Sequence, residues 1–346
     1  MFDKTIAQGW LAAALVASAM SAQASTITID MVTVGDPGNA ADTAANSGNP
    51  AGQGVVAYTY QIGKYDVTNN QYAAFLNAKA ASSDPYGLWD SIMQTTANGG
   101  IDRTGSGSYT YTVKSGQGNQ PVVGVTWFDA LRFANWLDNG QGSGDTETGS
   151  YTLLGGTPTP SNFRTLARNA GAQWVLPSED EWYKASYYKG GGTNAGYWTY
   201  PTRSNTAPTS EAPPGGANSA NFYDSTTGYA LSGSTTSVST MDYLTDVGAY
   251  CSSLGPYGTY DQGGDVWQWN EADTSVNGSG SSRGMRGGSS NNGSYNLAAS
   301  SRNGYAPANE DYHVGFRVGY LPEPGSIALL LAGAVALGIW KLRRNA

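Results

Sequence analysis

Apolar and polar residues alternate in two short stretches near the start of the chain. Residues 26–34 read Thr-Ile-Thr-Ile-Asp-Met-Val-Thr-Val, and residues 58–67 alternate around Ile62. A period of two places successive side chains on opposite faces of a strand, and Gly/Asn/Ala-rich sequence separates the two stretches. We therefore expect a β-strand in each.

Three further segments start with a hydroxyl residue that is followed, three positions later, by an acidic or amide residue. The pairs are Thr68 with Gln71, Thr126 with Asp129, and Ser178 with Glu181. In each pair the hydroxyl can accept from an amide of the first turn while the later side chain reaches back to the cap. Apolar residues at spacings of three and four follow each pair, which predicts three amphipathic helices.

Gly-, Ser- and Thr-rich sequence fills residues 94–120, 138–160 and 201–240, which we interpret as surface insertions. The 346 residues include 47 Gly, 23 Tyr and 10 Trp. Such a chain is rich in loops, yet its aromatic residues can build a core, so the composition is not that of a disordered polymer. Its length allows one large domain or two small ones.

The formal net charge of -8 argues against nucleic acid as a partner, because binding to phosphates needs clustered Lys and Arg. Peripheral binding to anionic lipid is disfavoured for the same reason. Cys251 is the only cysteine, so an intramolecular disulfide is excluded.

The N-terminus has the pattern of a secretory signal peptide. Lys4 precedes an apolar run from Trp10 to Met20, and residues 22–24 (Ala-Gln-Ala) offer small residues for cleavage before Ser25. We expect residues 1–24 to be removed by signal peptidase. A buried N-terminal helix is the alternative.

The C-terminus, residues 321–346, has three parts in order. Pro322-Glu323-Pro324 comes first, then an apolar run of 14 residues at 327–340, then a basic end, residues 341–344 (Lys-Leu-Arg-Arg). A membrane helix needs about 20 apolar residues, so this run is a marginal anchor, with its basic end on the cytoplasmic side. The pattern resembles the PEP-CTERM sorting tail of Gram-negative bacteria. That resemblance implies an exosortase-type membrane transpeptidase as a partner; a plain C-terminal anchor is the alternative.

Six ordered motifs run from the second predicted strand to the end of the domain. They lie at residues 65–72, 121–130, 176–182, 263–269 (Gly-Gly-Asp-Val-Trp-Gln-Trp), 286–289 (Arg-Gly-Gly-Ser) and 314–317 (Val-Gly-Phe-Arg). Together they resemble the formylglycine-generating enzyme (sulfatase-modifying factor) family over about residues 28–320. The resemblance implies one α+β domain at residues 25–320, of the C-type-lectin-like kind, rich in loops and with little regular secondary structure.

Resemblance to the oxidase branch of that family implies a copper enzyme with two cysteines shortly after the Gly-Gly-Ser motif. Thiolates of such cysteines are soft ligands that suit Cu(I). The matching positions here are approximately Asn292 and Leu297, and Cys251 lies upstream of the motif. A second branch resembles the sulfoxide synthases of ergothioneine biosynthesis, which bind iron through several histidines; this chain has only His313. We therefore recognise no copper or iron site. A Ser/His/Asp triad would also depend on His313, which we interpret as a loop or hydrogen-bonded residue.

Calcium is the cofactor that the resemblance supports, because hard cations take oxygen ligands from loops. The loop at Asn221 and Phe222 resembles the family's first calcium site. The resemblance implies Asp242 and the Leu244 carbonyl as the ligands that complete this site. At the second, Asp265 stands in place of Asn and Gln268 in place of Glu. The alternative is that all six are ordinary turn residues.

Other polar residues in the motifs have structural interpretations. Glu179, Asp180 and Glu181 lie in the first turn of a predicted helix, where the dipole favours negative charge, so we prefer capping to acid–base catalysis. We expect Arg286 and Arg317 to form buried polar pairs, with ligand binding as the alternative. We expect the motif tryptophans in the core: Trp127, Trp182, Trp267 and Trp269.

The sequence thus predicts an exported bacterial protein, on the cell surface or extracellular, that is transiently anchored by its C-terminal segment. Two hypotheses for its activity stay open. The first is a non-catalytic binding or structural module whose ligand is an extracellular polysaccharide or a protein. The second is a formylglycine-generating-type oxidoreductase or another enzyme with an unrecognised site. The missing cysteine pair and histidine set favour the first, since fold alone does not fix function.

Overall fold

The computed structural model describes residues 26–43 and 51–322. Its helices are α1 (Asn69–Lys79), α2 (Ile92–Thr95), α3 (Trp127–Asp138), α4 (Glu179–Tyr187), η1 (Val276–Gly278) and η2 (Ser294–Leu297). Its strands are β1 (Met31–Val34), β2 (Tyr60–Gly63), β3 (Ile101–Thr104), β4 (Thr110–Val113), β5 (Trp174–Val175), β6 (Thr209–Ser210), β7 (Ser219–Ala220), β8 (Tyr223–Asp224), β9 (Gly228–Tyr229), β10 (Trp267–Asp273), β11 (Arg283–Arg286), β12 (Asn303–Tyr305), β13 (Val314–Gly315) and β14 (Gly319–Tyr320). Short strands joined by long loops confirm the predicted loop-rich α+β class.

The first sheet joins the two ends of the domain. Its strand order is β1-β2-β14-β5, and every pairing is antiparallel. Gly319 of β14 pairs with Ile62 on one side and with Val175 on the other. The two strands expected from alternation are present as β1 and β2, although each is shorter than its pattern.

The second sheet is built from the C-terminal motifs. Its order is β12-β11-β10-β13, with β10 and β13 parallel and the other pairs antiparallel. Trp267 at the start of β10 pairs with Val314 of β13. Because β13 and β14 follow each other in the chain, the segment that joins them, residues 316–318, connects the two sheets.

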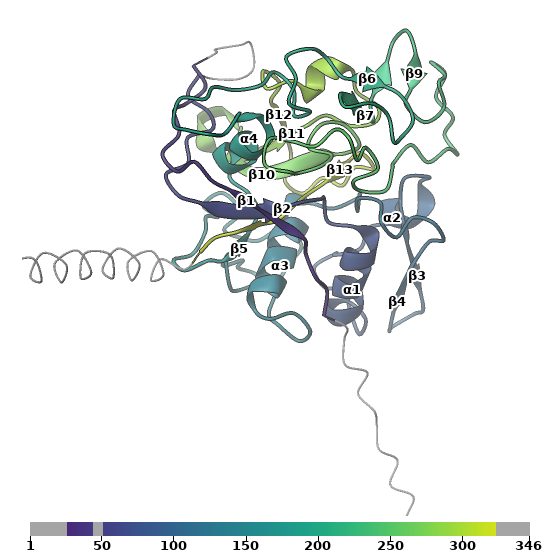
Figure 1. The fold of residues 1–346 in the computed structure, drawn as a ribbon. Helices are drawn as coiled ribbons and strands as arrows, with labels where there is room; N and C mark the ends of the chain where they lie inside the picture. The colour runs from purple at the N-terminus through teal and green to yellow at the C-terminus, as the bar shows by residue number, and fades with distance from the viewer. Residues whose placement is uncertain (1–25, 44–50, 323–346) are drawn as a thin grey trace, which may run out of the picture.

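The β1–β2 strands run across the middle of the molecule and separate an upper from a lower half (Figure 1). Helices α1 and α3 lie below the β1–β2 strands, while α4, the β10 sheet and the loops that carry β6, β7 and β9 lie above them.

The three predicted helices are confirmed as α1, α3 and α4, and each begins with a reciprocal capping box. At α3, for example, the Asp129 amide donates to Thr126 Oγ1 at 3.0 Å, and the Thr126 amide donates to the Asp129 carboxylate at 3.0 Å. Each box satisfies amides that would otherwise lack partners, which fixes where the helix starts.

Aromatic rings fill the space between α1, α3 and the C-terminal motif. Phe133 contacts Phe75 of α1 and Phe316 edge to face, with ring centroids 5.4 Å apart in both cases. Such pairs add about 0.5–1.5 kcal/mol each beyond burial of their area. The four motif tryptophans are at most 6% exposed, as predicted. The Val-Gly-Phe-Arg motif therefore completes the core.

Two of the expected surface insertions contain structure that their composition does not reveal. Residues 94–120 include the β3–β4 hairpin, and residues 201–240 include β6 to β9. Buried residues such as Ser219 and Phe222 show that the second of these segments also packs against the domain. In the described part of the chain, no helix is both long and apolar enough to cross a membrane.

Candidate functional site

A buried cluster around Arg317 lies where the two sheets meet. The Arg317 guanidinium donates from Nη2 to Asp66 Oδ2 at 3.2 Å, from Nε to Gln268 Oε1 at 2.7 Å and from Nη1 to the Gly63 carbonyl at 3.0 Å. Trp182 Nε1 donates to the same Gln268 oxygen at 2.7 Å. This Arg317 cluster connects β2, β10 and α4 to the C-terminal motif. The buried polar pair expected for Arg317 is confirmed.

Burial dominates the electrostatics of this cluster. It raises the pKa of Asp66 to about 7, even though Arg317 opposes the shift. It also raises the pKa of Asp261 to about 6. Asp66 Oδ1 has no hydrogen-bond partner among the described residues. Burial therefore disfavours the charged forms of Asp66 and Asp261, and Arg317 offsets this only in part.

The loop of residues 261–265 brings Asp265 against Asn221. Asp261, Gly264 and Asp265 have positive φ angles of 56°, 87° and 61°. A Cβ on Gly264 would lie 2.3 Å from the Asn221 carbonyl oxygen, so only glycine permits this approach. The approach lets the Asp265 amide donate to that oxygen at 2.8 Å.

Asp265 is the most enclosed of the predicted calcium ligands that carry charge. Its carboxylate accepts from Asn221 Nδ2 at 2.7 Å, from the Thr245 amide at 3.1 Å and from Thr245 Oγ1 at 3.2 Å. Burial and the nearby carboxylate of Asp261 raise its pKa well above the ordinary value. Asn221 Nδ2 also donates to the Tyr243 carbonyl at 2.7 Å.

The neighbouring segment places Asp242 and Leu244 on either side of Tyr243. Gln120 Nε2 donates to Asp242 Oδ2 at 2.8 Å and to the Leu244 carbonyl at 3.2 Å. Gln117 Nε2 also donates to Asp242 Oδ2, at 2.8 Å. Two glutamine amides therefore already satisfy these oxygens.

The structure brings five of the six predicted calcium ligands onto three adjoining segments. Asn221 is hydrogen-bonded to the Tyr243 carbonyl and to Asp265, and the carbonyl of the adjacent Phe222 accepts from Ser210 Oγ at 2.6 Å, whereas Gln268 belongs to the Arg317 cluster. A carboxylate such as that of Asp265 suits a hard cation, but its oxygens already accept from Asn221 and Thr245, so a cation would have to take the place of these hydrogen bonds. Among the described residues no three His, Cys, Asp or Glu side chains gather into a metal-binding group, so a cation here would depend on carbonyl and amide oxygens.

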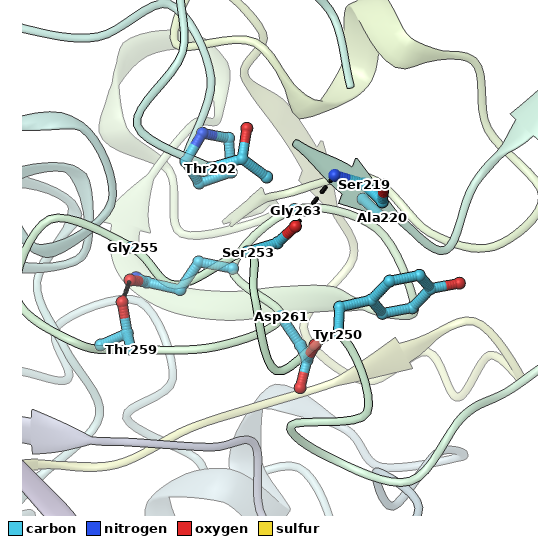
Figure 2. A pocket seen from close by; sticks show the side chains of 11 residues that line it. Thr202, Ser219, Ala220, Tyr250, Ser253, Gly255, Thr259, Asp261 and Gly263 are labelled. Atoms are coloured by element: carbon cyan, nitrogen blue, oxygen red, sulfur yellow. Dashed lines mark hydrogen bonds between the residues drawn. The ribbon is translucent and has the colours of Figure 1, made fainter. Parts of the chain in front are cut away.

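A small cavity lies beside this region. Figure 2 shows its walls, which come from residues Thr202, Ser219, Tyr250, Ser253, Thr259 and Asp261, among others. Its volume is about 10 Å³, which is about the room that one water molecule needs. The cavity is therefore too small to hold a substrate.

A larger depression opens between the α2 region and the Gly-Gly-Ser motif. It has a volume of about 310 Å³, and its lining includes Asn98, Tyr229, Tyr243, Ser290, Asn291, Tyr312 and His313. A second depression of about 210 Å³ is lined in part by the same Asn291 and His313 and by Asn292, Tyr305 and Asp311. We call the two together the tyrosine cleft.

The two positions that match the oxidase cysteines have different surroundings. Asn292 lines the tyrosine cleft, whereas Leu297 is fully buried and packs with Ala220 and Phe222. Cys251 is exposed and lines neither depression. No thiol therefore lines this cleft.

His313 was expected to be a loop or hydrogen-bonded residue, and it lies in the turn that precedes β13. Its Nδ1 is buried and has no hydrogen-bond partner among the described residues, and the same holds for Ser290 Oγ. Sequence reasoning missed Ser290, and it missed Tyr229, Tyr243 and Tyr312, because no motif links these scattered positions. The one available signal for Ser290 was its place directly after Gly-Gly-Ser.

The remaining predicted residues have structural partners. Arg286 and Arg302 both donate to the Glu179 carboxylate, each with a contact of 2.6 Å. Glu181 pairs with Arg168 at 2.6 Å, while Asp180 accepts from the Gly54 amide at 2.6 Å. These contacts support capping and pairing as the roles of the three acidic residues.

Pro322 is the last residue of the sorting motif that the structure describes. It lines a groove of about 610 Å³ with Tyr58, Tyr60 and Tyr320. Glu323 and Pro324, like residues 1–24 and the apolar run, lie outside the described residues.

Two solved structures share this fold. Treponema denticola variable protein 1 is 19% identical, with 86% of this chain and 97% of that chain covered and a TM-score of 0.52. CarF is 21% identical, with 86% of this chain and all 100% of that chain covered and a TM-score of 0.56. At such identities the likeness concerns the fold alone. A search of curated protein sequences finds no match.

The sequence itself gives the family. The family model for the sulfatase-modifying factor enzyme 1-like domain matches residues 16–319 of this sequence. This range includes all six motifs. The chain therefore belongs to the family of sulfatase-modifying factor enzyme 1-like domains.

Proposed function

We propose that this chain is an exported member of its family that binds an extracellular ligand in the tyrosine cleft and does not oxidise thiols. The observation that carries the proposal is the lining of the cleft. It combines the Tyr312 ring, which is 44% exposed, with the polar side chains of Asn98 and Asn291. A concave surface with a few converging polar groups is the usual form of a ligand site.

The chemistry of the oxidase branch has no residues to support it at this cleft. Asn292 and Leu297 stand at the matching positions, and the single Cys251 cannot form a pair. An amide and an aliphatic side chain are poor ligands for Cu(I), which favours thiolates. A binding role, in contrast, does not require cysteines at positions 292 and 297.

We also propose that calcium stabilises the loops beside the cleft. Asn221, Phe222, Asp242, Leu244 and Asp265 would supply oxygen ligands, and a bound cation would offset the buried charge of Asp265. Gln268 supports this region from the Arg317 cluster. The role of calcium here is to hold loops in place rather than to take part in a reaction.

We propose export on the basis of the two ends of the chain. Signal peptidase removes residues 1–24, and an exosortase-type membrane transpeptidase acts at Pro322-Glu323-Pro324. The mature protein then resides on the cell surface or outside the cell. The apolar run and the basic end anchor the precursor in the membrane until that step.

Two measurements test the proposed function. The mature protein is incubated with a cysteine-containing sulfatase peptide, copper and oxygen, and mass spectrometry of the peptide should show no formylglycine. In parallel, cell-envelope material from the host should bind wild-type protein and Tyr295→Ala but not Tyr312→Ala. Tyr295 is a suitable control because it is 72% exposed and lines neither depression. Copper-dependent turnover, or equal binding by both variants, would refute the proposal.

A further inference from the structure

The groove beside Pro322 is open to solvent and mostly apolar. It has a volume of about 610 Å³. Its lining consists of Thr33, Pro37, Ala57, Tyr58, Thr59, Tyr60, Gln61, Tyr320 and Pro322. Of these lining residues only Tyr60 is buried, whereas Ala57 and Thr59 are exposed and Tyr58 and Tyr320 are half-buried. A molecule in the groove would therefore contact side-chain surface that the domain itself leaves uncovered.

Residues paired across the first sheet form one wall of this groove. Thr33 of β1 pairs with Gln61 of β2, and Gln61 pairs with Tyr320 of β14. Tyr320 pairs in turn with the half-buried Trp174 of β5, and the two rings meet edge to face with centroids 5.1 Å apart. Residues directly opposite each other on neighbouring strands share a face of the sheet. The groove is thus built on a rigid sheet face and continues into a Tyr–Trp pair.

The wall of the groove carries no formal charge. The described residues that line it include no Asp, Glu, Lys or Arg. Two carboxylates that adjoin the lining already have partners. Glu181, which accepts from the Tyr58 hydroxyl at 2.6 Å, is paired with Arg168, and Asp36 accepts from the Tyr257 hydroxyl at 2.9 Å. Such a wall favours a neutral, apolar occupant, because a charged one would lose its hydration without gaining a counter-charge.

The chain leaves the described structure at this groove. Strand β14 is paired on both sides up to Tyr320, and the next amide, that of Leu321, donates to the Gln173 carbonyl at 2.8 Å. Leu321 also packs against the core. Pro322 is thereby held at the groove, and the apolar run of 14 residues begins five positions later in the sequence, at Ile327.

The link between the groove and the apolar run is short compared with the dimensions of a bilayer. Five residue steps span at most about 17 Å, at about 3.4 Å for each residue. The headgroup layer on each side of a bilayer is about 5–8 Å thick, because the bilayer measures about 40–45 Å in all and its hydrocarbon about 30 Å. If the apolar run starts in the hydrocarbon, Pro322 therefore lies at most about 12 Å beyond the headgroups, even with the link fully extended.

We propose that this groove is a lipid-contact site, which in the anchored precursor lies on the membrane surface and accommodates part of a zwitterionic phospholipid. The inference rests on the proposed anchoring of the precursor and adds which face of the domain meets the lipid. Tyr58, Tyr320 and Trp174 then lie at the level of the headgroups, where tyrosine and tryptophan are enriched. The lipid is zwitterionic because anionic headgroups repel a protein with a net charge of -8.

The lipid contact depends on the anchor for its strength. The apolar run keeps the groove at a high effective concentration of lipid, so a contact that is weak by itself is occupied. Removal of the tail ends that advantage. The same processing step that cuts the anchor therefore also frees the groove.

The test uses the full chain, reconstituted through its C-terminal segment into phosphatidylcholine vesicles. Cys251 is the single cysteine and is exposed, so in a Cys251→Ser background Thr59→Cys supplies a unique thiol in the groove. A nitrobenzoxadiazole dye on that thiol reports the polarity around it, and phospholipids with a nitroxide in the headgroup region quench the dye on contact. We expect the emission at position 59 to shift to the blue and to be quenched.

Matched variants separate the groove from the rest of the surface. Ser225 is exposed like Thr59 and lies in the turn before β9, across the molecule from β5 (Figure 1). Dye on Ser225→Cys should show neither the shift nor the quenching. Ala57→Asp should remove most of the quenching at position 59, because a carboxylate in the groove would lose hydration against lipid. Ser225→Asp should leave that quenching unchanged, and a melting curve of each variant shows that it is folded.

Each outcome has a distinct meaning. Quenching at position 59 but not at position 225, weakened by Ala57→Asp alone, supports the inference. Protein that floats with the vesicles while the dye at position 59 stays in water overturns the inference and leaves the anchor in place. Protein that does not float with the vesicles overturns both. A blue-shifted dye that the lipid nitroxides do not quench shows that the apolar run or a second copy fills the groove, which also overturns the inference.

Discussion

Arg317 Nη2 lies 3.2 Å from Asp66 Oδ2, and both side chains are fully buried. The two residues are 251 positions apart in the chain, so this contact ties the start of the domain to its end. It also positions Gln268, which both Arg317 and Trp182 use as an acceptor.

Arg317→Met should lower the free energy of unfolding by about 3–5 kcal/mol, because the buried acceptors of its guanidinium, which include Asp66, Gln268 and the Gly63 carbonyl, would lose their donor and Asp66 would have to take up a proton. Denaturant titration measures the loss. Arg302→Met is the matched control: Arg302 shares Glu179 with Arg286, which remains in place, so the cost should stay below about 1 kcal/mol. Equal losses in the two variants would show that the Arg317 contact adds nothing specific.

The carboxyl group of Asp129 should make stability depend on pH. Burial raises its pKa from 3.8 to about 7, with Glu310 adding to the shift and Thr126 and Arg132 opposing it. The folded state therefore binds this proton more tightly than the unfolded state. Stability from this group is fully present below pH 3.8 and is lost as the pH rises through about 7.

Asp129→Asn keeps an acceptor for the Thr126 amide and cannot ionise. Its melting temperature relative to wild type should therefore rise between pH 4 and pH 7 and stay level above that, as the shift from 3.8 to about 7 requires. Differential scanning calorimetry across this range measures it. A difference that does not change with pH would contradict the expectation.

Calcium should raise the melting temperature of the wild-type protein relative to the protein in chelator. A ligand present at 100 times its dissociation constant adds about 2.7 kcal/mol to the stability of the state that binds it. Asp265→Asn should abolish the calcium effect and should be more stable than wild type in chelator, because it removes a buried charge. Asp224→Asn, at a turn carboxylate bonded to the Thr226 and Thr227 amides, should respond to calcium as wild type does. Identical wild-type melting curves with calcium and with chelator would end the calcium proposal.

Replacement of Pro322 and Glu323 by Ala should trap an uncleaved precursor in the inner membrane, because the processing enzyme loses its recognition motif while the apolar run remains. Intact-mass spectrometry of protein from the native host measures this. Loss of residues 1–24 in the same sample controls for export itself. A mature wild-type chain that still carries Arg343 and Arg344 would show that the tail is only an anchor.

Local signals in the sequence predicted local structure well. The capping pairs at Thr68, Thr126 and Ser178 located three helix starts, because the partners are three residues apart and act without the rest of the fold. The motifs likewise predicted buried roles for Arg286 and Arg317. The β3–β4 hairpin was missed because its Gly- and Ser-rich sequence resembles a loop; its strands are kept in place by contacts with α1 and α2.

The tyrosine cleft could not be predicted in the same way. Its walls combine Asn98, Tyr229, Tyr243, Ser290 and Tyr312, which no periodic pattern connects. Only the folded chain brings them together. The calcium ligands show the same limit: the resemblance placed Gln268 with Asp265, whereas the side chain of Gln268 accepts from Arg317 and Trp182.

The order of strands along the chain also has a consequence for how the domain matures. Strand β14 lies between β2 and β5, and β13 pairs with β10, yet both arrive last, at residues 314–320. A chain that crosses a membrane with its N-terminus leading leaves both sheets incomplete until those residues emerge. Contacts of such long sequence separation form slowly. If the chain is exported as proposed, neither sheet can therefore be completed until residues 314–320 have crossed the membrane.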